Sequence, residues 1–90
     1  MTVLNGYEQV NRNWTGPFSS GAVYDFYVDC PSGKLVLGGG FDASNGGNGA
    51  GPNLLASWPS AIDGEPRRWN IRVQPTTQLD YVTVFATCAS

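Results

Sequence analysis

Regular alternation of apolar and polar residues is the clearest pattern in this sequence. It is strict over residues 22–30, where one side collects apolar side chains and the other side is more polar. The same alternation returns over residues 68–74 and 79–88. Because successive side chains of a β-strand point to opposite faces, the pattern predicts three strands that each bury one face. The side chains expected inside are Tyr24, Phe26, Val28, Cys30, Trp69, Ile71, Val73, Val82, Val84, Ala86 and Cys88.

Shorter segments of the same kind fill the rest of the chain. Residues 6–14, 34–37 and 53–58 are predicted to be further strands, separated by clusters of Gly, Pro, Asn and Ser. No segment repeats its apolar residues at the spacing of three and four that a helix requires. Six to seven short strands with such turns predict an all-β protein, a single antiparallel β-sandwich of the jelly-roll or Greek-key kind. Residues 1–90 are expected to form one domain.

Prolines and glycines mark the expected turns. Pro31-Ser32-Gly33 predicts a tight turn, because proline fixes one backbone angle and glycine allows a positive φ. Residues 34–37 are then expected to return beside residues 22–30 as the second strand of a hairpin. Pro17 is expected to end or bend the strand that precedes it, and Pro59 to end its strand, because proline cannot donate a hydrogen bond to a sheet.

Three consecutive glycines follow the second strand of this expected hairpin. Gly38–Gly40 would weaken a strand, so we interpret them as a place where a bulky ring approaches the backbone, with Trp58 and Trp69 as candidates. A phosphate-binding loop would require a helix after the glycines, and no helix is predicted there. Residues 42–52 are rich in glycine and lack large apolar residues, which predicts an exposed loop.

The two cysteines, Cys30 and Cys88, both fall on the apolar faces of their predicted strands. Both side chains are therefore expected to point into one core, and we predict a disulfide between them. Loop-closure entropy gives such a bridge about 4 kcal/mol of stabilisation, which is a large share for a domain of this size. The alternative is a pair of buried reduced thiols, which pack as small apolar groups.

The composition limits the classes of partner. Charged residues make up 13% of the chain, about half the usual share of soluble domains, which suits an extracellular or virion surface. The net charge is −2 and the one basic cluster is Arg67-Arg68, so no nucleic acid is expected. No apolar run reaches the roughly 18 residues of a membrane helix, so no membrane is expected either. Residues 1–7 lack the basic and apolar regions of a signal peptide.

The sequence offers little reaction chemistry. It contains no histidine, which removes Ser-His and Cys-His nucleophile systems and most zinc sites. Asp25 and Asp29 share a strand face, but four residues of strand separate them by about 13 Å, beyond the roughly 5–9.5 Å of glycosidase carboxylate pairs. We therefore predict no catalytic residue, no metal site, no cofactor and no enzymatic activity.

Aromatic residues are the main candidate functional feature. Three Trp, four Tyr and four Phe exceed what one small core hides. Phe26 and Trp69 are expected in the core, whereas other aromatic side chains are expected on the outward faces of the strands. These rings are candidates either for a subunit interface, where aromatics are enriched, or for stacking against a sugar. The interface is favoured, because burial between subunits also supports a marginal core. The candidate residues are Tyr27, Trp58, Tyr81 and Phe85.

Several short motifs together resemble a known module. They are Gly6-Tyr7-Glu8, Cys30-Pro31-Ser32-Gly33-Lys34, Val36-Leu37-Gly38-Gly39-Gly40, Ala56-Ser57-Trp58-Pro59, Trp69, and the ending Val82-Thr83-Val84-Phe85-Ala86-Thr87-Cys88-Ala89. The chain resembles a small β-rich module that recurs in exported actinobacterial proteins and in phage virion proteins. The resemblance covers most of the chain and implies a disulfide-linked β-sandwich without known catalytic residues.

From the resemblance and the missing leader we expect a stand-alone component of a bacteriophage virion, exposed on the particle surface. It would act as a capsid decoration or a tail appendage, as a homotrimer that contacts other virion proteins such as the major capsid or tail protein. The alternative is a secreted or cell-surface location. The chain would then be a carbohydrate-binding module that stacks a host cell-wall glycan on Tyr27, Trp58 or Tyr81.

Overall fold

The described part of the chain forms six β-strands. The computed structural model describes residues 6–44 and 52–90, and these residues contain no helix, so none of them forms a helix able to cross a membrane. The strands are β1 Glu8–Phe18, β2 Tyr24–Asp29, β3 Leu35–Ser44, β4 Asn53–Ile62, β5 Glu65–Gln74 and β6 Leu79–Ala89.

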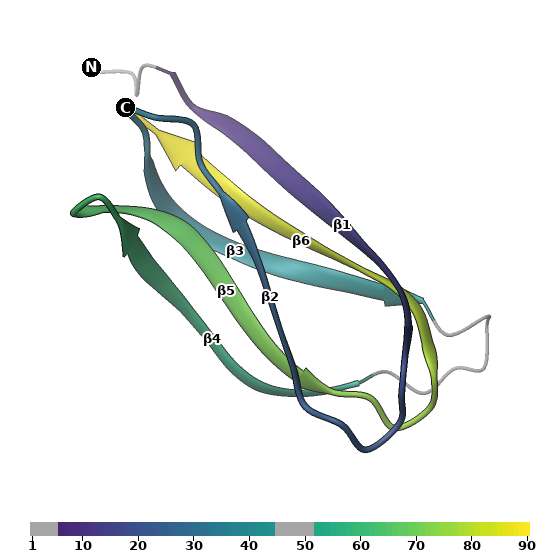
Figure 1. Ribbon diagram of the computed structural model, residues 1–90. Coiled ribbons are helices and arrows are strands. Elements are labelled where there is room, and N and C mark those ends of the chain that lie inside the picture. The colour runs from purple at the N-terminus through teal and green to yellow at the C-terminus, as the bar shows by residue number, and fades with distance from the viewer. Residues whose placement is uncertain (1–5, 45–51) are drawn as a thin grey trace.

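The strands form two antiparallel sheets that face each other (Figure 1). One sheet has the order β1-β6-β3 and the other β2-β5-β4. The first strand thus pairs with the last and the second with the fifth, as in a ribbon wound into a jelly roll. The predicted all-β sandwich is confirmed, with six strands.

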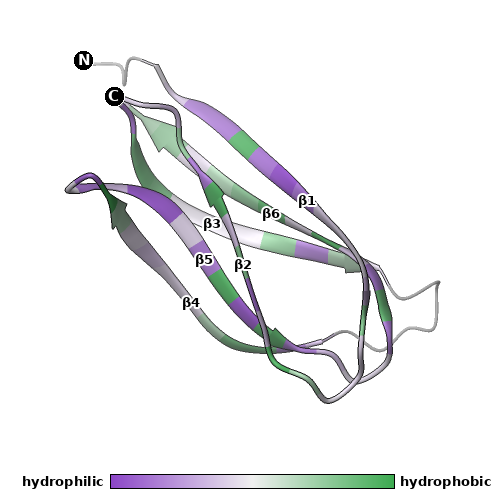
Figure 2. Cartoon of the chain, in the orientation of Figure 1, coloured by the Kyte–Doolittle hydropathy of each residue, from purple (hydrophilic) through white to green (hydrophobic). Residues whose placement is uncertain are grey.

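The core lies between the two central strands. Ile71 and Val73 of β5 and Val82 and Val84 of β6 are fully buried, and Phe26 of β2 packs among them. Figure 2 shows the corresponding contrast, since β6 carries mainly apolar colours whereas the edge strand β1 is largely hydrophilic. The alternation in the sequence therefore identified the inward faces correctly.

The disulfide between Cys30 and Cys88 is present, with a Cα–Cα distance of 5.9 Å. Both residues are buried, and the bond joins the end of β2 to the end of β6. Because these strands belong to different sheets, the bridge ties the two layers together at this end of the sandwich.

The turn after Cys30 forms, but the predicted hairpin is wrong. The amide of Lys34 donates to the carbonyl of Pro31 at 3.1 Å, and Gly33 has a φ of 87°. However, β2 pairs with β5 and β3 pairs with β6, so the turn carries the chain from one sheet to the other. Alternation identifies the buried face of a strand but not its neighbour.

The strand end predicted at Pro59 is also wrong, and at Pro17 the strand becomes irregular without ending. β1 continues past Pro17 to Phe18, with a register shift after Thr15, and β4 continues past Pro59 to Ile62. Both are edge strands, where the missing amide of proline costs no hydrogen bond if it faces away from the neighbouring strand. β3 likewise extends to Ser44, and residues 45–51 of the predicted loop 42–52 lie outside the described residues.

Gly39 is the point of close approach expected within the three glycines. A Cβ atom built there would collide with the Trp69 ring and the Phe85 carbonyl oxygen. Trp69 of β5 therefore packs under β3, and Trp58 is not the ring that the glycines admit. The absence of a side chain at Gly39 lets the two sheets close over the indole.

Candidate functional site

The four candidate aromatic residues lie on opposite outer faces of the sandwich. Tyr27 of β2 and Trp58 of β4 are both in register with Asn70 of β5, on the outer face of the β2-β5-β4 sheet. Tyr81 and Phe85 lie on β6, on the outer face of the β1-β6-β3 sheet. They therefore cannot form one common site.

Positively charged side chains cover the Tyr27 ring. The guanidinium carbon of Arg68 lies 3.9 Å from the ring centroid and that of Arg12 lies 5.0 Å from it. Trp14 meets the same ring edge-on, with 5.2 Å between centroids. Tyr27 is half-buried by these neighbours, so its ring is engaged within the protein and does not offer a free stacking surface.

Both carboxylates beside Tyr27 are paired as well. Asp25 accepts two hydrogen bonds from Arg72 at 2.8 and 3.2 Å, and Asp29 accepts two from Arg68 at 2.7 and 3.1 Å. The hydrogen bond from Arg72 holds the pKa of Asp25 below its usual value, and the hydrogen bond to Asp29 raises the pKa of Arg68. Both carboxylates therefore already form cross-strand ion pairs with arginine.

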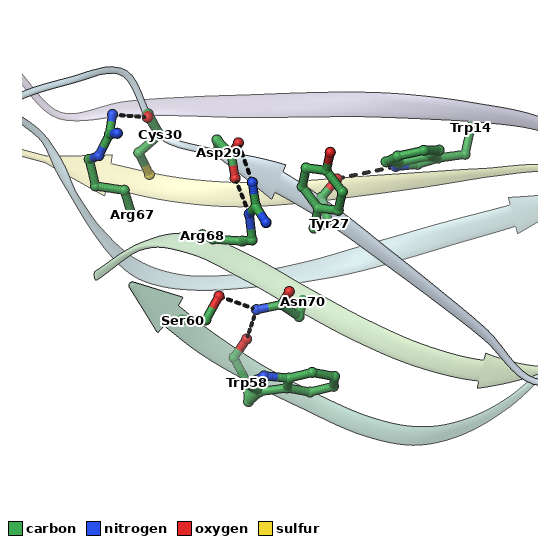
Figure 3. Close-up of polar contacts among 9 residues, drawn as sticks. All are labelled: Trp14, Tyr27, Asp29, Cys30, Trp58, Ser60, Arg67, Arg68 and Asn70. Atoms are coloured by element: carbon green, nitrogen blue, oxygen red, sulfur yellow. Dashed lines mark hydrogen bonds and ion pairs between the residues drawn. The ribbon is translucent and has the colours of Figure 1, made fainter. Parts of the chain in front are cut away.

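Trp14 connects the two sheets at this side of the sandwich. Its indole N–H donates to the carbonyl oxygen of Tyr27 at 3.1 Å, as Figure 3 shows, and its ring lies 5.7 Å from that of Phe26. Arg12 stacks over the outer side of Trp14 at 4.0 Å. Alternation over residues 6–14 puts Arg12 and Trp14 on the same strand face. Only the folded structure shows that both side chains contact Tyr27 and so hold β1 against β2.

Trp58 lies on the edge strand β4. The side-chain amide of Asn70 donates to the carbonyl oxygen of Trp58 at 3.1 Å and to the hydroxyl of Ser60 at 2.9 Å (Figure 3). Arg72 lies 5.3 Å from the Trp58 ring centroid. The hydrogen bonds of Asn70 thus hold the β4 backbone at this point, and the indole stays half-exposed beside a cation.

The outer face of the β1-β6-β3 sheet contains a hollow of about 500 Å³. Gly38–Gly40 form its floor, Leu37 and Phe85 form its walls, and Gln9 and Thr87 bound it. Sequence reasoning treated the glycines only as a packing position and missed the hollow. The signal that was available is the alternation itself, which places Gly38 and Gly40 on the face opposite Gly39.

Large apolar side chains remain exposed on the two edge strands that border the other side of the sandwich. Leu35 and Leu37 lie on β3, and Leu54 and Leu55 lie on β4. Within residues 6–44 and 52–90, the other exposed large apolar side chains are Tyr7 and Val23, which lie outside the strands. Among the described strands, the exposed leucines are thus concentrated on β3 and β4, two of the four edge strands.

No metal-binding cluster of Cys, Asp or Glu side chains is found within residues 6–44 and 52–90. Comparison with known proteins gives no further assignment, because no family model, no curated protein and no solved structure matches this chain. The resemblance to the phage and actinobacterial module therefore stays a prediction.

Proposed function

We propose that this protein is a non-enzymatic structural component of a bacteriophage particle, which assembles on the virion surface as a capsid decoration or tail appendage. Copies of the chain associate with one another, with a homotrimer as the favoured form, and with a neighbouring virion protein such as the major capsid or tail protein. The proposal joins the sequence resemblance to the surface properties of the sandwich.

The observation that carries the proposal is the uncharged, apolar character of β4, an edge strand that is interrupted only by Pro59 and two register shifts. This edge strand contains no charged residue between Asn53 and Ile62, and it exposes Leu54 and Leu55 beside its unpaired edge. Isolated proteins usually protect such edges with lysines, short strands or covering loops, because a bare edge pairs with other chains. A partner that covers β4 would bury both leucines and satisfy the free backbone groups of the strand.

The Tyr27 face supports the same interpretation by elimination. Its rings, guanidinium groups and carboxylates are occupied by one another, so this face acts as a rigid outer wall. The available contact area is then at β4, which carries two exposed leucines. An interface of standard size buries about 800 Å² on each partner, which one side of a small sandwich is able to supply.

Two measurements test the proposal. Protein identification by mass spectrometry on purified phage particles is expected to find the chain as a virion component, and its absence from such particles would contradict the proposal. Size-exclusion chromatography with light scattering is expected to give a stable oligomer, with three copies favoured. If the protein is a monomer at all concentrations, the exposed edge of β4 does not support the proposal.

A further inference from the structure

The outer face of the β1-β6-β3 sheet has a regular arrangement around its hollow. Phe85 on the central strand is in register with Asn11 of β1 and Gly40 of β3. In the next row, Thr87 is in register with Gln9 and Gly38. Around the hollow, the face therefore presents the half-buried Phe85 ring, amide side chains along one flank, and glycine backbone along the other.

Gly38 is not explained by the packing of this chain. A Cβ atom at Gly38 would meet no atom within 4 Å, and Gly38 is not among the glycines with positive φ. Gly39, by contrast, is required by the approach of Trp69. A glycine that neither turns the chain nor admits a neighbour weakens a strand, so its benefit here is the open space above it.

The Phe85 ring lies beside this open space. Its Cε2 atom would be 3.5 Å from a Cβ atom at Gly40, which is ordinary van der Waals contact, so the ring lies beside β3 at Gly40. Leu37, displaced outward at a register shift between Val36 and Gly38, forms the opposite apolar wall. A ligand in the hollow would thus contact a ring, a branched aliphatic group and flat glycine backbone.

The polar groups around the hollow carry no charge. Gln9 and Thr87 line the hollow with an amide and a hydroxyl, and the amide of Asn11 lies beside this lining, in register with Phe85. None of these side-chain groups hydrogen-bonds to another residue in the described part of the chain. Each amide both donates and accepts, which matches hydroxyl groups of a ligand that do the same. The uncharged lining favours a neutral ligand over an ionic one.

We propose that this hollow binds a neutral oligosaccharide, with the apolar face of one pyranose ring on Phe85 and hydroxyl groups toward Gln9 and Asn11. A pyranose has one face of C–H groups and a rim of hydroxyls, which is the combination that this surface complements. Concave sites with apolar walls and few polar groups are typical of small-ligand binding. The proposal is independent of particle assembly, because β4 takes no part in the hollow.

The test is an amide NMR titration of the intact, oxidised chain with cellohexaose, maltohexaose and chitohexaose in turn. At least one probe is expected to shift the amide signals of Asn11, Gly38, Gly40 and Phe85. Gly38→Val fills the open space with a residue that suits a strand, and is expected to abolish those shifts. Phe85→Ala is the second variant, expected to weaken binding about tenfold or more through loss of the ring.

Trp58→Ala is the matched control, since it removes a half-exposed ring from the opposite sheet and is expected to leave binding unchanged. An acidic hexagalacturonate of the same length is expected to bind less well than the neutral probe. The proposal is overturned if no neutral probe shifts any signal, if the shifts map to the Tyr27 face, or if Gly38→Val retains the wild-type affinity. Since oligomeric state is measured separately, none of these outcomes bears on assembly.

Discussion

At the scale of single residues, Gly39 and Gly38 are neighbours with opposite roles. Gly39→Ala is expected to destabilise the fold by about 2 kcal/mol, because the new methyl group overlaps the Trp69 ring and the Phe85 carbonyl oxygen. Gly38→Ala meets open space and is expected to leave stability unchanged or raise it by up to about 1 kcal/mol. Urea denaturation of the two variants checks both values, and equal effects would contradict this account.

Asp25 is the residue whose titration is linked to folding. Because the hydrogen bond from Arg72 lowers the pKa of Asp25, the pair stabilises the native state above the ordinary pKa of 3.8. That stabilisation is lost as the pH falls through the lowered native pKa. The pair is exposed, so the effect is small.

Urea midpoints measured between about pH 5 and pH 2 test this linkage. The wild-type midpoint is expected to fall on acidification, and Asp25→Asn is expected to reduce the size of that fall. Asp80→Asn is the control, because the exposed Asp80 pairs with no other described residue. If both variants follow the wild-type curve, the Asp25–Arg72 pair does not contribute to acid sensitivity.

At the scale of strands, Trp14 is what holds β1 against β2. Trp14→Phe keeps an aromatic ring but removes the hydrogen bond to the Tyr27 carbonyl, and is expected to cost about 1 kcal/mol. Trp14→Ala also removes the contacts with Phe26 and Tyr27 and is expected to cost about 3 kcal/mol. Trp58→Phe, whose indole N–H has no partner among the described residues, is the control and should change stability little.

The disulfide acts between the same two layers at one end of the sandwich. It closes a sequence separation of 58 residues, for which loop-closure entropy gives about 4 kcal/mol. The double variant Cys30→Ala/Cys88→Ala is therefore expected to lose about that much free energy of unfolding. Thermal denaturation with and without a reductant should reproduce the same difference in the wild-type protein. A loss below about 1 kcal/mol would show that the core alone holds the sheets together.

Strand faces were predictable from this sequence, whereas strand neighbours were not. Alternation placed Cys30 and Cys88 on inward faces because burial acts on every second side chain. The pairing of β2 with β5 depends on contacts such as Asp25–Arg72 and Asp29–Arg68, which link residues far apart in the chain. Propensity treats Pro17 and Pro59 as strand ends, and only the sheet order reveals that both lie on edge strands.

For the candidate site, too, the outward faces were predictable from the sequence but the neighbours of each side chain were not. Alternation placed Tyr27 and Phe85 on outward strand faces, and the structure has both there. Alternation could not show that two guanidinium groups cover Tyr27, or that glycines beside Phe85 leave space above β3. Those differences arise from cross-strand register, which no local pattern in the sequence specifies.

At the scale of the whole molecule, the sandwich is protected on one side and bare on the other. All four outer strands have one unpaired edge, but β1 and β2 are joined by the Trp14 hydrogen bond and ring contacts, whereas β3 and β4 carry exposed leucines. This asymmetry predicts that self-association uses β4. Leu55→Lys places a charge on that edge and is expected to shift the oligomer toward monomer without loss of stability, because Leu55 is 49% exposed.

Val23→Lys is the matched control for that change. Val23 is exposed to a similar extent, 53%, but it precedes β2 on the protected side of the sandwich. Both variants add the same charge and remove a comparable apolar surface, so a general effect of charge on association would appear equally in both. Sedimentation at several concentrations distinguishes the outcomes. Dissociation by Leu55→Lys alone assigns the interface to β4, whereas dissociation by Val23→Lys alone would move it to the other side of the sandwich.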